Sequence, residues 1–172
     1  MNGNKEIFAS ECYIKKSSSL SPLKGTDINF PASGSSDPSL VILSCDHAIS
    51  AALTFFVNSI GFRPVVLDHL GASIGIVEIL VRLRKAIVDG VIQCIGVIID
   101  ADAVEDVFDL HSELVLFRSE LPYIAVIISS KWVSSQTNPN VHFYLWDTLI
   151  CPPYNDSMLS GAFALALSRV LP

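Results

Sequence analysis

The stretch IQCIGVIID, residues 92–100, is a near-continuous apolar run of strand length that ends in an acid. Such a run suits a strand that is covered on both faces, as in a parallel sheet. Similar runs occur at SLVILS (39–44), RPVVLD (63–68) and IAVIIS (124–129), and a shorter one, TLIC, at 148–151. The sequence therefore predicts a sheet of five parallel strands.

The segments between these runs carry apolar residues three and four positions apart, which is the spacing of one helix face. We expect helices around residues 49–60, 76–87, 104–114 and 159–167. A further helix between the last two strands is in question, because Asn138, Pro139 and Asn140 interrupt its segment. Alternating strands and helices predict a doubly wound α/β fold with right-handed crossovers.

Composition limits the domain organisation and the partners. The chain has 172 residues, enough for one sizeable core. Residues 1–38 are rich in Ser, Pro, Gly and Lys, so we predict a flexible arm followed by one domain over 39–172. A net charge of −6 without a basic stripe argues against nucleic acid as a partner.

The sequence also argues against a membrane protein. No apolar stretch reaches the roughly 18 uninterrupted residues that a spanning helix needs. The first twenty residues carry several charges and no apolar run, which is unlike a secretory signal. We therefore predict a cytoplasmic protein.

Polar residues follow the predicted strands at their carboxyl ends, where ligands and reactive groups gather in an open parallel sheet. They are Cys45 and Asp46 after the first strand, Asp100 and Asp102 at the third, Ser129 and Ser130 at the fourth, and Cys151 followed by two prolines at the fifth.

The order and spacing of these motifs resemble those of response-regulator receiver domains over nearly all of residues 39–172. VILSCD is similar to the family's first strand, which ends in two acids. Asp100 in VIID matches the phosphoacceptor and Ser129 matches a Ser/Thr position. Cys151 stands where the family has a Lys. The resemblance implies a flavodoxin-like receiver fold.

The resemblance also implies a function in phosphorelay signalling rather than an enzyme. We expect Mg²⁺-dependent phosphorylation of Asp100, with Ser129 sensing the phosphate. Asp46, Asp100 and the backbone carbonyl of Asp102 would hold the metal. The implied partners are a histidine kinase or phosphotransfer protein and a downstream protein target.

Several positions depart from the family pattern. Cys45 replaces the first acid, Cys151 replaces the Lys, and Thr148 replaces an aromatic residue. The stretch between Asp46 and Asp100 is longer than usual, and we place the extra residues in a long second helix. Loss of the Lys removes a charge-assisted contact to the phosphate.

The alternative to a phosphorylated receiver is a phosphorylation-independent pseudo-receiver that acts as an interaction module. A small-molecule-binding α/β domain is a more distant alternative.

Local alternatives remain for the individual residues. Asp46 and Asp100 each precede a helical segment, so either could be only a helix N-cap. Ser129 could have no role beyond starting a turn. In the receiver register Cys45 and Cys151 replace a charged pair, so they are either small buried hydrophobes or a redox pair or soft-metal site.

Two helices are poor in charge. Between His47 and Arg63 the sequence has no charged residue, which is unusual for a solvated helix face and suggests a surface for protein contact. The last helix, with Phe163, Leu165 and Leu167 among Ala and Ser, could pair in a homodimer or simply pack into the core.

Overall fold

The computed structural model describes residues 38–67, 74–131 and 145–170. Within them, five parallel strands form one sheet in the order β2-β1-β3-β4-β5. The strands are β1 (Ser39–Leu43), β2 (Arg63–Leu67), β3 (Cys94–Asp100), β4 (Ala125–Ser129) and β5 (Thr148–Ile150). The predicted doubly wound sheet is confirmed. Nearly all of the predicted arm, and the segment with Pro139, lie outside the described residues, so the division into arm and domain stays a prediction.

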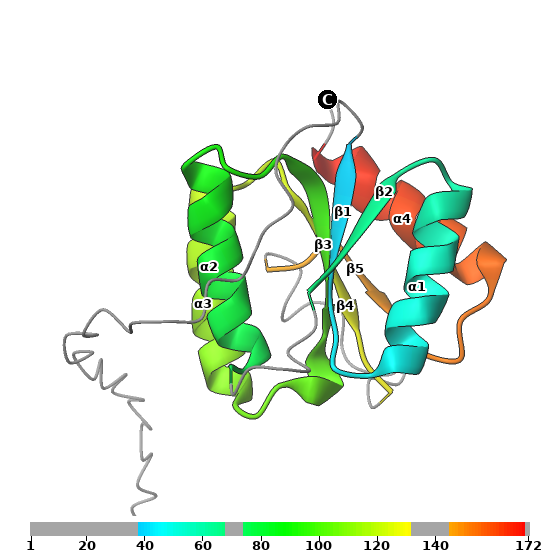
Figure 1. The fold of residues 1–172 in the computed structure, drawn as a ribbon, viewed down its shortest axis with the longest axis horizontal. Coiled ribbons are helices and arrows are strands. Elements are labelled where there is room, and N and C mark those ends of the chain that lie inside the picture. The colour runs from blue at the N-terminus through cyan, green and yellow to red at the C-terminus, as the bar shows by residue number, and fades with distance from the viewer. Residues whose placement is uncertain (1–37, 68–73, 132–144, 171–172) are drawn as a thin grey trace, which may run out of the picture.

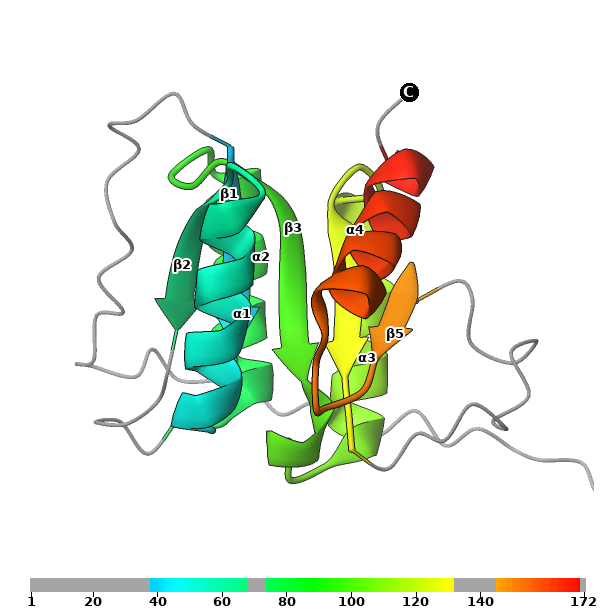
Figure 2. The same cartoon turned by 90° about the vertical axis from the view of Figure 1, so that its right-hand side faces the viewer.

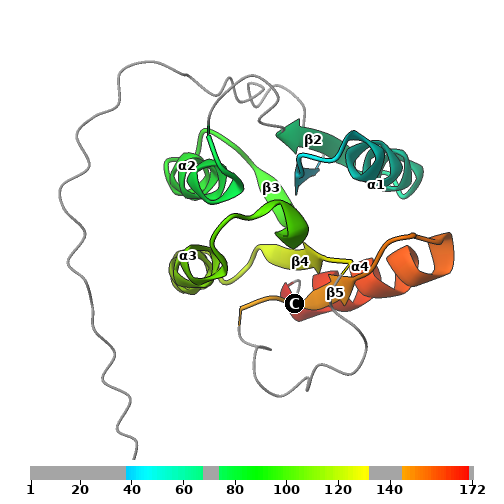
Figure 3. The same cartoon turned by 90° about the horizontal axis from the view of Figure 1, so that it is seen from below.

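In the described part of the chain, four α-helices cover the sheet: α1 (His47–Ser59), α2 (Ile76–Val88), α3 (Val107–Glu120) and α4 (Asp156–Val170). Figures 1 and 3 show α1 and α4 on one face and α2 and α3 on the other. No helix in the described ranges is long and apolar enough to cross a bilayer. The expectation of a long second helix is wrong, because α2 has 13 residues, as α1 does.

The third predicted helix begins later than its apolar spacing suggested. Residues Ala101–Ala103 form a short 3-10 turn, η1, directly after β3. Helix α3 then begins at Val107, because Asp106 accepts hydrogen bonds from the backbone N–H groups of Phe108 and Asp109. This cap satisfies amides that the first helical turn leaves without partners.

The sheet separates two hydrophobic clusters, which explains the continuous apolar runs in the strands. All five residues of β1 and all five of β4 are buried. Alternate residues of each strand point to opposite faces. Val41 and Leu43 therefore pack beneath α2 and α3, while Leu40 and Ile42 pack beneath α1 and α4.

Gly96 in β3 permits close packing within the sheet. A Cβ atom at this position would lie 2.7 Å from Leu40 Cδ2 and 3.2 Å from both Cβ and the backbone oxygen of Ala125. Leu40 and Ala125 belong to the cluster beneath α1 and α4. Leu40 and Ala125 therefore occupy the space that a side chain at position 96 would need.

The two helical layers are held by different contacts. Between α1 and α4, the rings of Phe56 and Phe163 pack in a tilted arrangement with centroids 5.1 Å apart. Between α2 and α3, Arg84 Nε donates to Glu113 Oε1 at 2.5 Å, and Nη1 donates to Glu120 Oε2 at 2.6 Å. Glu113 is only 5% exposed, so this is a buried ion pair.

The short strand β5 is fixed at its start by side chains. Arg118, near the end of α3, donates to the backbone oxygens of Ile124 and Leu145 at 2.9 and 3.0 Å and also to the carboxylate of Asp147. Asp147 Oδ2 accepts from the backbone N–H of Val126 at 2.7 Å, and its own N–H donates to the Val126 oxygen at 2.8 Å. These bonds hold the entry to β5 against β4.

Candidate functional site at the carboxyl ends of the strands

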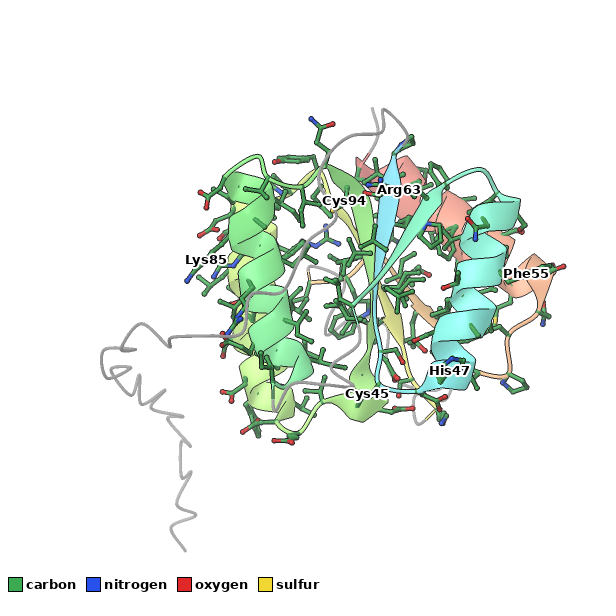
Figure 4. The ribbon with its side chains drawn as sticks, viewed as in Figure 1. Cys45, His47, Phe55, Arg63, Lys85 and Cys94 are labelled. Atoms are coloured by element: carbon green, nitrogen blue, oxygen red, sulfur yellow. The ribbon has the colours of Figure 1, made fainter. Side chains whose placement is uncertain are left out.

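The sheet register brings the predicted site residues to one edge. Leu43 pairs with Ile99, and Asp100 pairs with Ser129, so Ser44 follows β1 at the level of Asp100. Figure 4 shows Cys45 and His47 at this edge, while Arg63 and Cys94 lie at the opposite end of the sheet.

Asp100 is buried, with 3% of its surface exposed. Ser44 Oγ donates to Asp100 Oδ2 at 2.7 Å, and the backbone N–H of Asp102 donates to Oδ1 at 3.3 Å. Burial raises the pKa of Asp100, and the charge of Asp102 raises it further, while the two hydrogen bonds and the charge of Lys131 act in the opposite direction. Asp100 also caps the turn η1, so the N-cap interpretation holds in part.

Asp46 is the N-cap of α1. Its Oδ1 accepts from the backbone N–H groups of Ala48 at 2.9 Å and Ile49 at 3.3 Å. Its Oδ2 lies 3.4 Å from Lys131 Nζ. The hydrogen bonds from Ile49 and Ala48 lower the pKa of Asp46, and Lys131 lowers it further. Its N-cap role is confirmed.

The carboxylate of Asp102 organises the turn after β4. Ser130 Oγ donates to Asp102 Oδ1 at 2.6 Å, and the backbone N–H of Lys131 donates to Oδ2 at 2.7 Å. Asp102 thereby links η1 to β4. Lys131, whose side chain is 52% exposed, is in turn placed next to Asp46 at the rim.

Ser129 is fully buried and shares a hydrogen bond of 2.5 Å with the hydroxyl of Tyr154. Tyr154 lies after β5 and packs against the cluster beneath α1 and α4. Burial raises the pKa of this phenol, and the carboxylates of Asp100, Asp102 and Asp46 raise it further, although the bond from Ser129 lowers it. Tyr154 is therefore a neutral hydroxyl directed at the strand ends.

The two substituted positions do not form a disulfide bond. Cys45 is half-buried and packs against the cluster beneath α2 and α3. Cys151 is also half-buried, and its Sγ donates to the backbone oxygen of Pro152 at 3.5 Å. No group of three or more His, Cys, Asp or Glu side chains in the described ranges could hold a metal ion, so the soft-metal site of Cys45, Cys151, Asp46 and Asp100 is wrong. The redox pair stays a prediction.

The predicted Mg²⁺ ligands are near one another but are already engaged. The backbone N–H of Asp102 donates to Asp100, and Lys131 contacts both Asp102 and Asp46, so the three acids lie around one edge. Asp46 binds helix amides and Lys131, and Asp100 binds Ser44 and an amide. Mg²⁺ demands near-ideal octahedral oxygen geometry. The predicted site would offer Mg²⁺ the carboxylates of Asp46 and Asp100, which already accept hydrogen bonds from the protein. The Mg²⁺ site stays a prediction.

Sequence reasoning found Asp46, Asp100, Asp102 and Ser129 but missed what fills the space between them. Ser44 was assigned only to the end of a strand, although the pairing of β1 with β3 puts it next to Asp100. Lys131 and Tyr154 carry no motif of their own. Only their positions, shortly after the ends of β4 and β5, could have marked them as candidate site residues.

Comparison with known proteins gives a consistent answer about the fold. No family model matches the sequence, and no curated protein matches it. Solved structures do match. A CheY-like response regulator receiver domain protein from Methanospirillum hungatei is 15% identical, with a TM-score of 0.56 over 77% of this chain and 95% of that one. The fold is that of a response-regulator receiver domain.

Two proteins of Burkholderia pseudomallei have the same receiver fold. A "pilus assembly-related protein" is 17% identical, with a TM-score of 0.59 over 78% of this chain and 92% of that one. A response regulator with a phosphorylated aspartic acid, a calcium ion and citrate is 16% identical, with a TM-score of 0.55 over 78% and 71% of the two chains. At these identities the likeness concerns the receiver fold alone.

Proposed function

We propose that this protein is a signalling module with a receiver fold that acts by protein contact and does not use phosphorylation of Asp100 as its switch. The observation that carries this proposal is the hydrogen bond from the neutral hydroxyl of Ser44 to Asp100 Oδ2, 2.7 Å long. In the resembled family the first strand ends in two acids. Here Cys45 and Asp46 stand at those two positions, so only the second acid remains.

The electrostatics of the pocket support the same proposal. Phosphoryl transfer depends on cations that neutralise the phosphate oxygens. Cys151 has no positive charge to offer at the position that resembles the family's Lys. Burial favours the neutral form of Asp100, because it raises the pKa of this carboxyl, whereas the acceptor must be ionised.

The hydroxyl of Ser129 supports it as well. In the expected mechanism this hydroxyl senses the phosphate, which requires it to reach a phosphoryl group on Asp100. It shares a 2.5 Å hydrogen bond with Tyr154 instead, and it is fully buried. A phosphoryl group would have to break this bond before Ser129 could respond to it.

One observation favours a second candidate, slow phosphorylation of Asp100 by a kinase or phosphotransfer protein. Lys131 is near enough to Asp100 to lower its pKa, and it follows Ser129 by two positions. Its ammonium group could supply the charge that Cys151 lacks. The Burkholderia regulator with its phosphorylated aspartic acid has the same fold, which makes this candidate worth testing.

Treatment with acetyl phosphate and Mg²⁺, followed by intact-mass measurement, separates the two candidates. We expect no phosphoryl adduct on the wild-type chain. An adduct that Asp100→Asn abolishes would overturn the proposal in favour of the second candidate, and its further loss in Lys131→Ala would assign the cation. A Cys151→Lys variant serves as the matched gain-of-function control, because it restores a cation without changing Asp100.

A further inference from the structure

Exposed apolar side chains are concentrated on α3. Among the described residues, α1 exposes one large apolar side chain, Phe55, and α4 exposes one, Leu165. Helix α3 exposes four of them: Val107, Phe108, Val115 and Leu116. Figures 2 and 3 show α3 on the side of the sheet opposite to α1 and α4. Large apolar residues that gather on one surface helix are typical of a protein contact surface.

Most of these side chains belong to a ridge along α3. We define the α3 ridge by five exposed residues whose spacing of three and four positions places them on one side of the helix: Phe108, Ser112, Val115, Leu116 and Ser119. Ser112 Oγ donates to the backbone oxygen of Phe108 at 2.9 Å, and Ser119 Oγ donates to that of Leu116 at 2.8 Å. Both hydroxyl donors are used within the helix, so the ridge is mainly apolar.

Acidic residues surround the start of the α3 ridge. Glu105, Asp106 and Asp109 are all exposed. None of the three forms an ion pair with another residue of the described ranges. The sequence from 86 to 117 contains no Lys or Arg. The start of α3 therefore carries negative charge at the surface, which attracts cations and repels anions.

The basic residues near α3 are engaged or lie toward its other end. The side chains of Arg84 and Arg118 are only 11% and 14% exposed, and both are held in ion pairs. Lys85 points outward from α2 (Figure 4). It follows Arg84, whose partner Glu120 is the last residue of α3. Lys85 therefore lies toward the later turns of α3, away from the acids at its start.

We propose that the α3 ridge, with the acids at its start, binds an amphipathic helix of a partner protein that has an apolar stripe flanked by Lys or Arg. A ridge with helical spacing packs into the groove between side-chain rows of a second helix. The negative charge selects a basic helix over an acidic one. It also disfavours nucleic acid, an anionic membrane and a second copy of this chain, whose net charge is −6.

This inference rests on the proposed action by protein contact but not on the chemistry of Asp100. The acetyl phosphate experiment tests Asp100 and does not involve α3. Binding to the α3 ridge is measured without phosphorylation. The two experiments can therefore fail separately.

Titration calorimetry of the full chain with three synthetic peptides tests the surface. The first peptide has Leu on one helical face and Lys on the other. The second replaces every Lys by Glu, and the third has the composition of the first in an order without helical spacing. We expect the first to bind at least about tenfold more tightly than the others, because only it offers both cations and an apolar stripe. No binding of the first peptide, or equal binding of another, overturns the inference.

A matched pair of phenylalanine variants locates the contact. Phe108→Gln should weaken binding of the first peptide by at least about tenfold, because it removes the largest apolar side chain of the ridge. Phe55→Gln is the control, since Phe55 is 75% exposed on the opposite layer and its loss should leave binding unchanged. Both positions are exposed, and thermal denaturation checks that both variants fold. Unchanged binding by Phe108→Gln, or an equal loss in Phe55→Gln, would place the peptide elsewhere and overturn the inference.

A second pair of variants tests the charge. Glu105→Gln with Asp109→Asn should weaken binding by roughly two- to tenfold at low salt and reduce its salt dependence. Asp89→Asn with Asp156→Asn removes two exposed charges from other helix ends and should have a smaller effect. Equal effects of the two double variants contradict the role of the acids at the start of α3. Sedimentation of the wild-type chain tests a second copy as the occupant, and a dimer that Phe108→Gln dissociates also overturns the inference.

Discussion

The two helical layers of this domain cover the same sheet in different ways. The α2/α3 layer joins its helices by the buried pair of Arg84 and Glu113 and has charged residues on its outer surface. The α1/α4 layer has an aromatic contact between Phe56 and Phe163, and the charged residues of its two helices are limited to Asp156 and Arg169 near the ends of α4. Both layers bury an apolar stripe on the sheet, so the core does not require the difference. The difference between the layers therefore lies in their helix–helix contacts and outer surfaces.

The largest effect is expected from breaking the anchor of the α1/α4 layer. Phe163→Ala removes a buried ring from the contact with Phe56 and leaves a cavity. The free energy of unfolding should fall by about 3–5 kcal/mol, measured by urea denaturation. Phe108→Ala is the control, because Phe108 is 83% exposed and should change stability by less than about 0.5 kcal/mol. Equal losses would contradict the assignment of Phe163 to the core.

Breaking the ion pair of the α2/α3 layer should cost somewhat less. Arg84→Met leaves the buried carboxylate of Glu113 without its guanidinium, and we expect a loss of about 3 kcal/mol in the free energy of unfolding. The double variant Arg84→Met with Glu113→Leu should recover most of this loss, since no buried charge remains. Urea denaturation of the wild type, the two single variants and the double variant gives the coupling energy. Simple additivity of the two single losses would show that the pair does not act as a unit.

Two glycines on the α1/α4 side should respond in opposite directions. Gly96→Ala places a Cβ atom within 3.2 Å of Ala125 and closer still to Leu40, so stability should fall by roughly 1–3 kcal/mol. Gly161→Ala meets open space in the middle of α4 and should raise stability by up to about 1 kcal/mol. Thermal denaturation at low protein concentration checks both signs. A rise for Gly96→Ala would refute the close packing of β3.

The smallest change is expected at the strand ends, which both layers share. Burial raises the pKa of Asp100 above its ordinary value of 3.8, so the folded state holds this proton to higher pH than the unfolded chain does. The stabilising contribution is present below pH 3.8 and is lost as the pH rises through the folded pKa. Asp100→Asn removes this loss and should raise the free energy of unfolding at about pH 7. Its advantage should shrink toward about pH 4. An advantage that is independent of pH would contradict this account.

Much of the fold could be predicted from the sequence because its signals are local. Near-continuous apolar runs gave the five strands, and three-and-four spacing gave the four described helices. The boundaries that moved did so for local reasons too. Asp106 caps α3 and delays its start beyond η1, and the apolar spacing from Val104 onward did not reveal this cap.

The site was less predictable because it depends on pairing between strands. Sequence spacing found Asp100 and Ser129, which are direct neighbours across β3 and β4. It did not reveal that Ser44 contacts Asp100, because this contact joins residues 56 positions apart through the register of β1 and β3. Tyr154 was missed for a similar reason. It follows the prolines after β5, and only the folded chain brings its hydroxyl to Ser129.

The side chains around Arg118 bear on the position of Cys151. Arg118 and Asp147 fix the entry to β5 by bonds to Ile124, Val126 and Leu145, all of which lie outside residues 132–144. Among the described contacts, these bonds set the register of β5 from the α3 side. Because Cys151 follows β5 directly, the same bonds also determine where its thiol lies relative to the end of β4.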